Sequence, residues 1–73
     1  MTLRITISDK KEWLGVKGLI SKFKKGGNYS IELKFPEEKR TLVLPEKYNL
    51  SSYDVLDLRQ VVGIDNVMEI SKG

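Results

Sequence analysis

Residues 9–27 read Asp9-Lys10-Lys11-Glu12-Trp13-Leu14-Gly15-Val16-Lys17-Gly18-Leu19-Ile20-Ser21-Lys22-Phe23-Lys24-Lys25-Gly26-Gly27, and the fold depends on which structure they adopt. As a helix, Asp9 would cap the N-terminus and Glu12 would follow three residues later, as in a capping box. One helical face would then be apolar, formed by Trp13, Val16, Leu19, Ile20 and Phe23. Gly15 and Gly18 oppose this interpretation, because glycine costs about 1 kcal/mol inside a helix.

The same residues can also form β structure. Residues 8–17 would then be a long turn and residues 18–23 a strand. Residues 24–28, with Gly26 and Gly27, would form a hairpin loop that leads to Tyr29, because glycine suits the positive φ angles of tight turns. Gly18 would permit strand curvature. Here the glycines have a structural use that the helix does not give them.

The flanking segments predict strands in either case. Apolar and polar residues alternate over residues 3–7, 29–35 and 40–44, which is the period of a half-buried strand. A turn at 36–39 joins the last two segments, and Pro45 is expected to stop the second. The expected core residues of this hairpin are Ile31, Leu33, Phe35 and Leu42. Residues 51–62 suggest a short helix or turn, capped by Ser51 or Ser52 and closed by Gly63, and residues 66–70 suggest a closing strand with Val67 or Met68 inward.

A family resemblance bears on the choice of fold. The segment Gly15-Val16-Lys17-Gly18-Leu19-Ile20, the strand 29–35 and the segment Lys39-Arg40-Thr41-Leu42-Val43-Leu44 together resemble Tudor-like and KOW-like small barrels. Within these barrels, the chain looks most like the Tudor-like C-terminal domain of bacterial DNA-repair helicases, over about residues 15–50. Gly18, Phe23 and Asn28 are also similar to the first motif of Sm-like proteins. Lys24, however, stands where that family usually has Asp, and its second-motif arginine-glycine is missing before Asp65.

Both resemblances imply β structure over residues 9–27. We therefore predict a mainly β fold: a single five-stranded barrel of the Src-homology-3 type that spans residues 1–73. The alternative is an α+β fold with the element order βαββαβ, a split βαβ sandwich, in which a helix starts at the Asp9 cap and is ended by Gly26-Gly27.

Length and composition restrict the chemistry. A chain of 73 residues allows one domain. It contains no Cys and no His, which removes thiolate chemistry and the usual proton shuttle at neutral pH. Asp54, Asp57 and Asp65 are not arranged as in a calcium-binding loop, and Gly26-Gly27 lacks the Lys-Ser/Thr of a phosphate-binding loop. We therefore expect no enzymatic activity, no metal and no cofactor.

Charge suggests the partner. Residues 1–40 hold ten Lys or Arg against five Asp or Glu, and residues 41–73 hold three against five. A basic half attracts anionic partners, although it can also be only a solvated lysine surface. Trp13 lies among these lysines and would either stack on a base or cover one end of a small barrel. The candidate nucleic-acid-binding residues are Lys10, Lys11, Trp13, Lys17, Lys22, Lys24 and Lys25.

These observations predict a binding module that associates with DNA or RNA. The alternative is a protein-interaction adaptor that docks on transcription or repair machinery, as the resemblance to helicase domains implies. The N-terminus lacks the apolar run of a signal peptide, and the sequence shows no apolar run of the roughly 18–20 residues that cross a bilayer. We therefore expect a cytoplasmic protein without membrane association, and the oligomeric state stays open.

Overall fold

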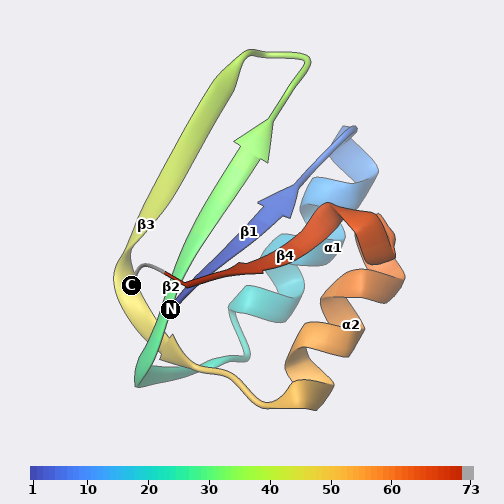
Figure 1. Ribbon diagram of the computed structural model, residues 1–73. Helices are drawn as coiled ribbons and strands as arrows, with labels where there is room; N and C mark the ends of the chain where they lie inside the picture. Colours follow the sequence, from blue (N-terminus) through green and yellow to red (C-terminus); the bar gives the residue numbers. More distant parts are fainter. Residues whose placement is uncertain (72–73) are drawn as a thin grey trace.

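The protein is built on one four-stranded mixed sheet, as seen in a computed structural model that describes residues 1–71. The strands are β1 (Thr2–Thr6), β2 (Lys24–Phe35), β3 (Arg40–Asn49) and β4 (Val67–Ile70), and they lie in the order β3-β2-β1-β4 (Figure 1). β1 and β2 are parallel, whereas β3 is antiparallel to β2 and β4 is antiparallel to β1. The ladder is thus open at β3 and at β4.

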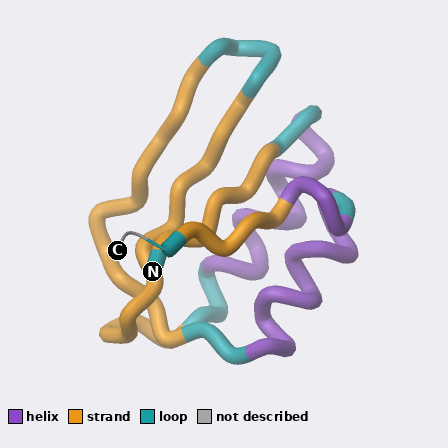
Figure 2. The backbone as a smooth tube through the Cα atoms, in the orientation of Figure 1, coloured by secondary structure: helices purple, strands orange, loops and turns teal. Residues whose placement is uncertain are grey.

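Two helices cover one face of this sheet. They are α1 (Lys10–Ile20) and α2 (Ser52–Val62), and a short 3₁₀ helix, η1 (Ile64–Asn66), leads from α2 into β4. Figure 2 shows both helices on the same side of the strands, so that the opposite face, here named the open face, has no covering layer. The molecule is therefore a two-layer α+β fold.

The predicted five-stranded barrel is wrong, because the sheet has four strands and does not close. The element order of the alternative, βαββαβ, is confirmed. Its first β–α–β unit is not split, however, because β1 and β2 are direct neighbours in the sheet.

Local hydrogen bonds explain why residues 10–20 form a helix. The Asp9 carboxylate accepts a hydrogen bond from the Glu12 amide at 2.8 Å, and the Glu12 carboxylate accepts one from the Ser8 amide at 2.8 Å. These bonds satisfy amides that a helix start leaves without partners. Val16 is fully buried on the inner face of α1. Residues 18–23, predicted as a strand, instead form the end of this helix and the turn after it.

The two glycines of α1 have different surroundings. A Cβ atom on Gly15 would lie 2.9 Å from Cγ1 of Val61 in α2, whereas a Cβ on Gly18 would have no atom within 4 Å. Gly15 therefore allows α1 and α2 to approach closely. The structural use of Gly15 lies in helix packing, not in a β turn.

We expect Gly18→Ala to raise the free energy of unfolding by about 0.5–1 kcal/mol, because alanine loses less backbone entropy in a helix than glycine does. Urea denaturation would measure this change. Gly15→Ala is the matched control, and its contact with Val61 should cancel the same gain. Equal stabilisation by both variants would contradict the close helix packing.

The core lies between the sheet and the two helices. Its fully buried side chains come from both layers: Leu3, Ile5, Ile31, Leu33 and Val67 from the strands, and Val16 and Leu58 from the helices. Ile31, Leu33 and Phe35 are buried as predicted. Leu42 is not, because 43% of its surface is exposed. Leu42 lies on the edge strand β3, and Figure 1 shows the upper part of the β2–β3 hairpin extending past the helices.

The β2–β3 hairpin contains two irregularities. Tyr48 of β3 lies opposite both Lys25 and Tyr29, so residues 26–28 of β2 bulge out of the ladder. Further along, Lys47 pairs with Ser30 and Val43 with Glu32, which leaves two extra residues on β3 around Pro45. Pro45 therefore does not stop the strand as predicted, because an edge strand can contain a residue without an N–H group.

The second helix matches its prediction. Ser51 is the N-cap and makes a reciprocal capping box with Asp54, and Gly63 is the C-cap. Val55, Leu58 and Val62 form the buried stripe of α2. In β4, Val67 is buried and Met68 is exposed.

Candidate functional site

The predicted site residues fall on one continuous segment, although not on the expected elements. Lys10, Lys11 and Lys17 lie on α1, not in a loop. Lys22 lies in the connection after α1, and Lys24 and Lys25 begin β2. All six lysines are exposed. Because α1 is about 16 Å long, Lys10 at its start lies well away from the lysines that follow its end.

Trp13 is largely engaged in the fold. Its ring packs edge-to-face against Phe35, with 5.6 Å between ring centroids and an interplanar angle of 77°. The Arg40 guanidinium lies 5.6 Å from the centre of the same Phe35 ring. Trp13 is only half-buried, but this packing supports its role as a cover of the core more than a role in base stacking.

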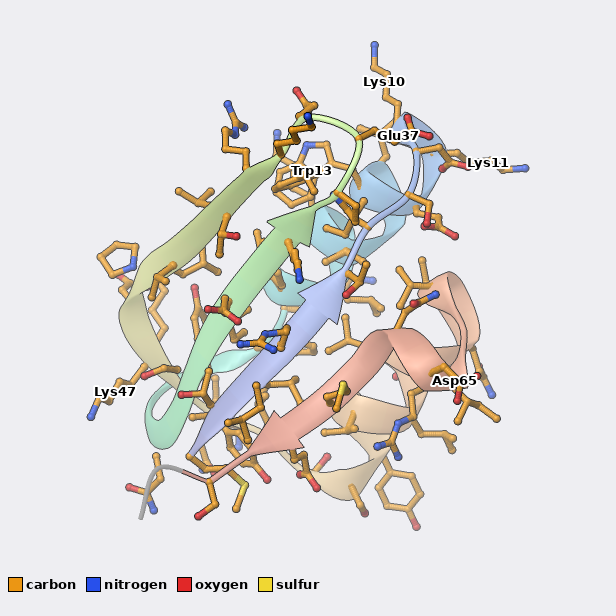
Figure 3. All side chains as sticks on the ribbon, turned by 45° about the horizontal axis from the view of Figure 1, so that its top comes forward. Lys10, Lys11, Trp13, Glu37, Lys47 and Asp65 are labelled. Carbon is orange, nitrogen blue, oxygen red and sulfur yellow. The ribbon has the colours of Figure 1, made fainter. Side chains whose placement is uncertain are left out.

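The surroundings of Trp13 are acidic. Trp13 and Lys10 line an open pocket of about 330 Å³ together with Asp9, Glu37 and Glu38. Figure 3 shows Trp13, Lys10 and Glu37 close together at one end of the molecule, with Lys47 at the opposite end. Three carboxylates facing one lysine repel phosphate, so this pocket is a poor place for a nucleic-acid backbone.

The other end of the segment is basic, and we name it the basic corner. It consists of Lys22, Lys24, Lys25 and Lys47. Lys25 pairs with Tyr48 across the β2–β3 ladder, so that its backbone lies close to that of Lys47, the residue before Tyr48. Lys22 and Lys24 line a second open pocket of about 340 Å³. The corner thus combines side chains from the α1–β2 connection, β2 and β3.

Carboxylates offset only part of this charge. The Lys25 ammonium lies 3.1 Å from a Glu46 carboxylate oxygen in an exposed ion pair. Asp54 lines the pocket of Lys22 and Lys24, and its carboxylate also accepts a hydrogen bond from the Ser51 amide. Four lysines against two carboxylates leave a net positive surface.

Sequence reasoning missed Lys47. The strand 40–44 was expected to stop at Pro45, so residues 46–49 had no predicted neighbours. In the structure β3 continues to Asn49, and Lys47 pairs with Ser30 just beyond the bulge that separates it from Lys25. The pairing register was the missing information, because a bulge next to a proline cannot be read from alternation alone.

The aromatic residues of the basic corner do not offer a free ring face. Phe23 and Tyr48 are both buried and pack edge-to-face, with 6.4 Å between their ring centroids. A strand of nucleic acid bound here would therefore meet lysines but no stacking platform.

Residues 1–71 contain no cluster of three or more Asp or Glu side chains placed to hold a metal ion. Neither helix in this part of the chain has the length and hydropathy needed to cross a membrane. Comparison of the chain with protein-family models, with curated proteins and with solved structures finds no match.

Proposed function

We propose that the protein is a non-enzymatic binding module whose basic corner contacts the phosphate backbone of nucleic acid. The observation that carries this proposal is that Lys22 and Lys24 line one pocket, while the β2–β3 register brings the backbone of Lys47 to the same end of the sheet as Lys24 and Lys25. Lysines act on phosphates as mobile point charges. They fix the position of a protein on nucleic acid without reading its sequence.

The buried aromatics make the proposal more specific. Without an exposed ring beside the lysines, the contact energy comes from phosphate neutralisation, which is strongly dependent on salt. Double-stranded nucleic acid has the higher charge density and is the favoured partner. We expect little discrimination between base sequences.

The proposal is tested with two triple variants that remove the same positive charge from different parts of the surface. Replacing Lys22, Lys24 and Lys47 with Gln should lower the salt slope of duplex DNA binding by about 2–3, since each lost phosphate contact removes about 0.9. Lys25 is retained, because its removal would free the Glu46 carboxylate. Fluorescence anisotropy over a range of salt concentrations would measure the slope.

The control replaces Lys10, Lys11 and Lys17 with Gln, which removes the same charge from α1. A change in slope of less than about 1 is expected for this control. Equal changes in both variants would show that net charge, not the basic corner, governs binding. Lack of measurable affinity for duplex or single strands at about 50 mM salt, where electrostatic attraction is strong, would contradict the proposal.

A protein-interaction adaptor is the second candidate, and the open face of the sheet favours it. Val43 on β3 and Met68 on β4 are each more than half exposed, and both flank the Arg4–Glu32 ion pair on the inner strands. Exposed apolar side chains that lie together on an uncovered face are a feature of interaction surfaces. Failure of nucleic-acid binding, together with retention of a protein partner, would favour this reading.

A further inference from the structure

A small polar pocket lies where the start of α2 meets β2 and β4. Its volume is about 200 Å³, and its lining includes Tyr29, Ser51, Ser52, Val55, Arg59 and Glu69. These residues come from β2, the β3–α2 connection, α2 and β4. It is separate from the lysines of the basic corner, none of which lines it.

Arg59 is the first unusual feature of this pocket. Its Nε atom is buried and has no hydrogen-bond partner within the described residues. A guanidinium N–H removed from water without an acceptor is unfavourable. Buried polar groups in native proteins are nearly always satisfied, so Arg59 is the member of this pocket whose guanidinium lacks full pairing within the described residues.

Glu69 supplies the opposite charge on the same pocket. Its carboxylate accepts a hydrogen bond of 2.7 Å from the Tyr29 hydroxyl. This bond, with some burial and the negative charge of Glu69, raises the pKa of Tyr29 above its ordinary value of 10.0. The phenol therefore stays protonated and holds the carboxylate in place. Within residues 1–71, Arg59 and Glu69 form no salt bridge with each other.

The pocket thus presents a hydrogen-bond donor, the Arg59 guanidinium, and an acceptor, the Glu69 carboxylate, that are not paired with each other. We propose that it binds a small carboxylic acid that carries an N–H group on its α-carbon, with the carboxylate on Arg59 and the N–H directed to Glu69. A planar carboxylate fits the edge of a guanidinium. Glu69 disfavours a dianion such as phosphate, and Val55 provides an apolar wall for a short side chain.

Free amino acids and the C-terminal residue of a peptide share this chemistry. Four probes separate the requirements: N-acetylalanine represents a peptide terminus, alanine a free amino acid, propanoate a carboxylate without the donor, and N-acetylalaninamide a donor without the carboxylate. The readout is the NMR signal of the Arg59 Nε–Hε group, identified by its loss in Arg59→Lys. Arg4 and Arg40 provide internal reference signals.

We expect N-acetylalanine or alanine to shift the Arg59 signal in a saturable manner, with a dissociation constant of about 1–10 mM, as suits so small a ligand. The stronger of the two identifies the source of the carboxylate. Propanoate should bind about tenfold more weakly, since it lacks the bond to Glu69, and the neutral amide should cause no shift. Equal binding of propanoate would overturn the proposed role of Glu69. Shifts that do not saturate, or that are equal at all three arginines, would overturn the site.

Variants provide a second readout. Glu69→Gln keeps an acceptor for Tyr29 but removes the charge, and it should weaken the preferred probe about fivefold to tenfold without weakening propanoate, because two carboxylates then no longer repel each other. Arg59→Lys should weaken every carboxylate. Arg40→Lys makes the same substitution beside Phe35, outside the pocket, and should have no effect. An effect of Arg40→Lys as large as that of Arg59→Lys would also contradict the site.

Discussion

Gly27→Ala is expected to remove most of the folding free energy of this protein. A Cβ atom at Gly27 would overlap the Tyr48 carbonyl oxygen and the backbone of Asn49 on β3. These are backbone atoms of the paired strand, so no rotamer change relieves the overlap. The bulge at 26–28 would have to open, and the pairing of Lys24 and Lys25 with β3 would be lost with it.

The size of this effect follows from the size of the domain. At about 0.05–0.15 kcal/mol per residue, the whole chain is stable by about 4–11 kcal/mol. Loss of the bulge geometry should cost more than about 4 kcal/mol, the range of exceptional substitutions. Thermal and urea denaturation followed by circular dichroism would measure it. Little or no native signal at room temperature is the expected result.

Gly26→Ala is the control for this prediction. Gly26 has a φ angle of 87° but no atom within 4 Å of a Cβ placed on it. Alanine there carries only the backbone penalty of about 1–2 kcal/mol for a left-handed conformation. Comparable losses at Gly26 and Gly27 would show that the strands do not approach each other as closely as described.

Leu33→Ala is expected to have the second largest effect. Leu33 is fully buried in β2, which has neighbouring strands on both sides and helices against one face. Truncation of such a leucine costs about 2–5 kcal/mol, because it loses apolar burial and leaves a cavity. Chemical denaturation would report a large fall in the midpoint with an unchanged slope.

Leu42→Ala is the matched control, since Leu42 pairs directly with Leu33 across the ladder. The substitution is the same, but Leu42 is partly exposed on the edge strand and leaves no closed cavity. Its loss should cost about 1 kcal/mol or less. Equal costs at the two positions would mean that the helices cover β3 as fully as β2.

The fold was predictable from sequence up to the choice made at residues 9–27. The helix signals were present there, because Asp9 and Glu12 form the expected capping interactions. The two glycines, Gly15 and Gly18, argued against a helix because each was counted only by its low helix propensity. The reason for Gly15 is its contact with Val61, about 46 residues away along the chain, and such long-range packing overrides local propensity.

The position of each strand within the sheet could not be predicted from the sequence either. Alternation placed Leu33 and Leu42 on the same face correctly, but it cannot tell a covered strand from an edge strand. The same limit applies to Pro45, which reads as a strand end in sequence. An edge position with two extra residues accommodates it.

The candidate binding surfaces were also predictable only in part from the sequence. Composition identified the basic half of the chain, but only topology separates Lys10 and Trp13 in an acidic pocket from Lys22 and Lys24 in the basic corner. Tyr29, Arg59 and Glu69 form no local motif, and Tyr29 and Glu69 are 40 residues apart. No sequence signal marks that pocket, because three elements must pack before it exists.

The interruption of β3 at Pro45 also bears on how the protein behaves at high concentration. An exposed strand of ten residues is a template on which other chains can add strands and start an aggregate. Pro45 offers no N–H group, and the extra residues beside it bend the edge, so an incoming strand would find no continuous row of partners. At the opposite edge β4 has only four residues, too few to hold an added strand. Both open edges of this small sheet therefore disfavour amyloid-like growth, and the domain can keep its lysines and its open face exposed without adding strands from other chains.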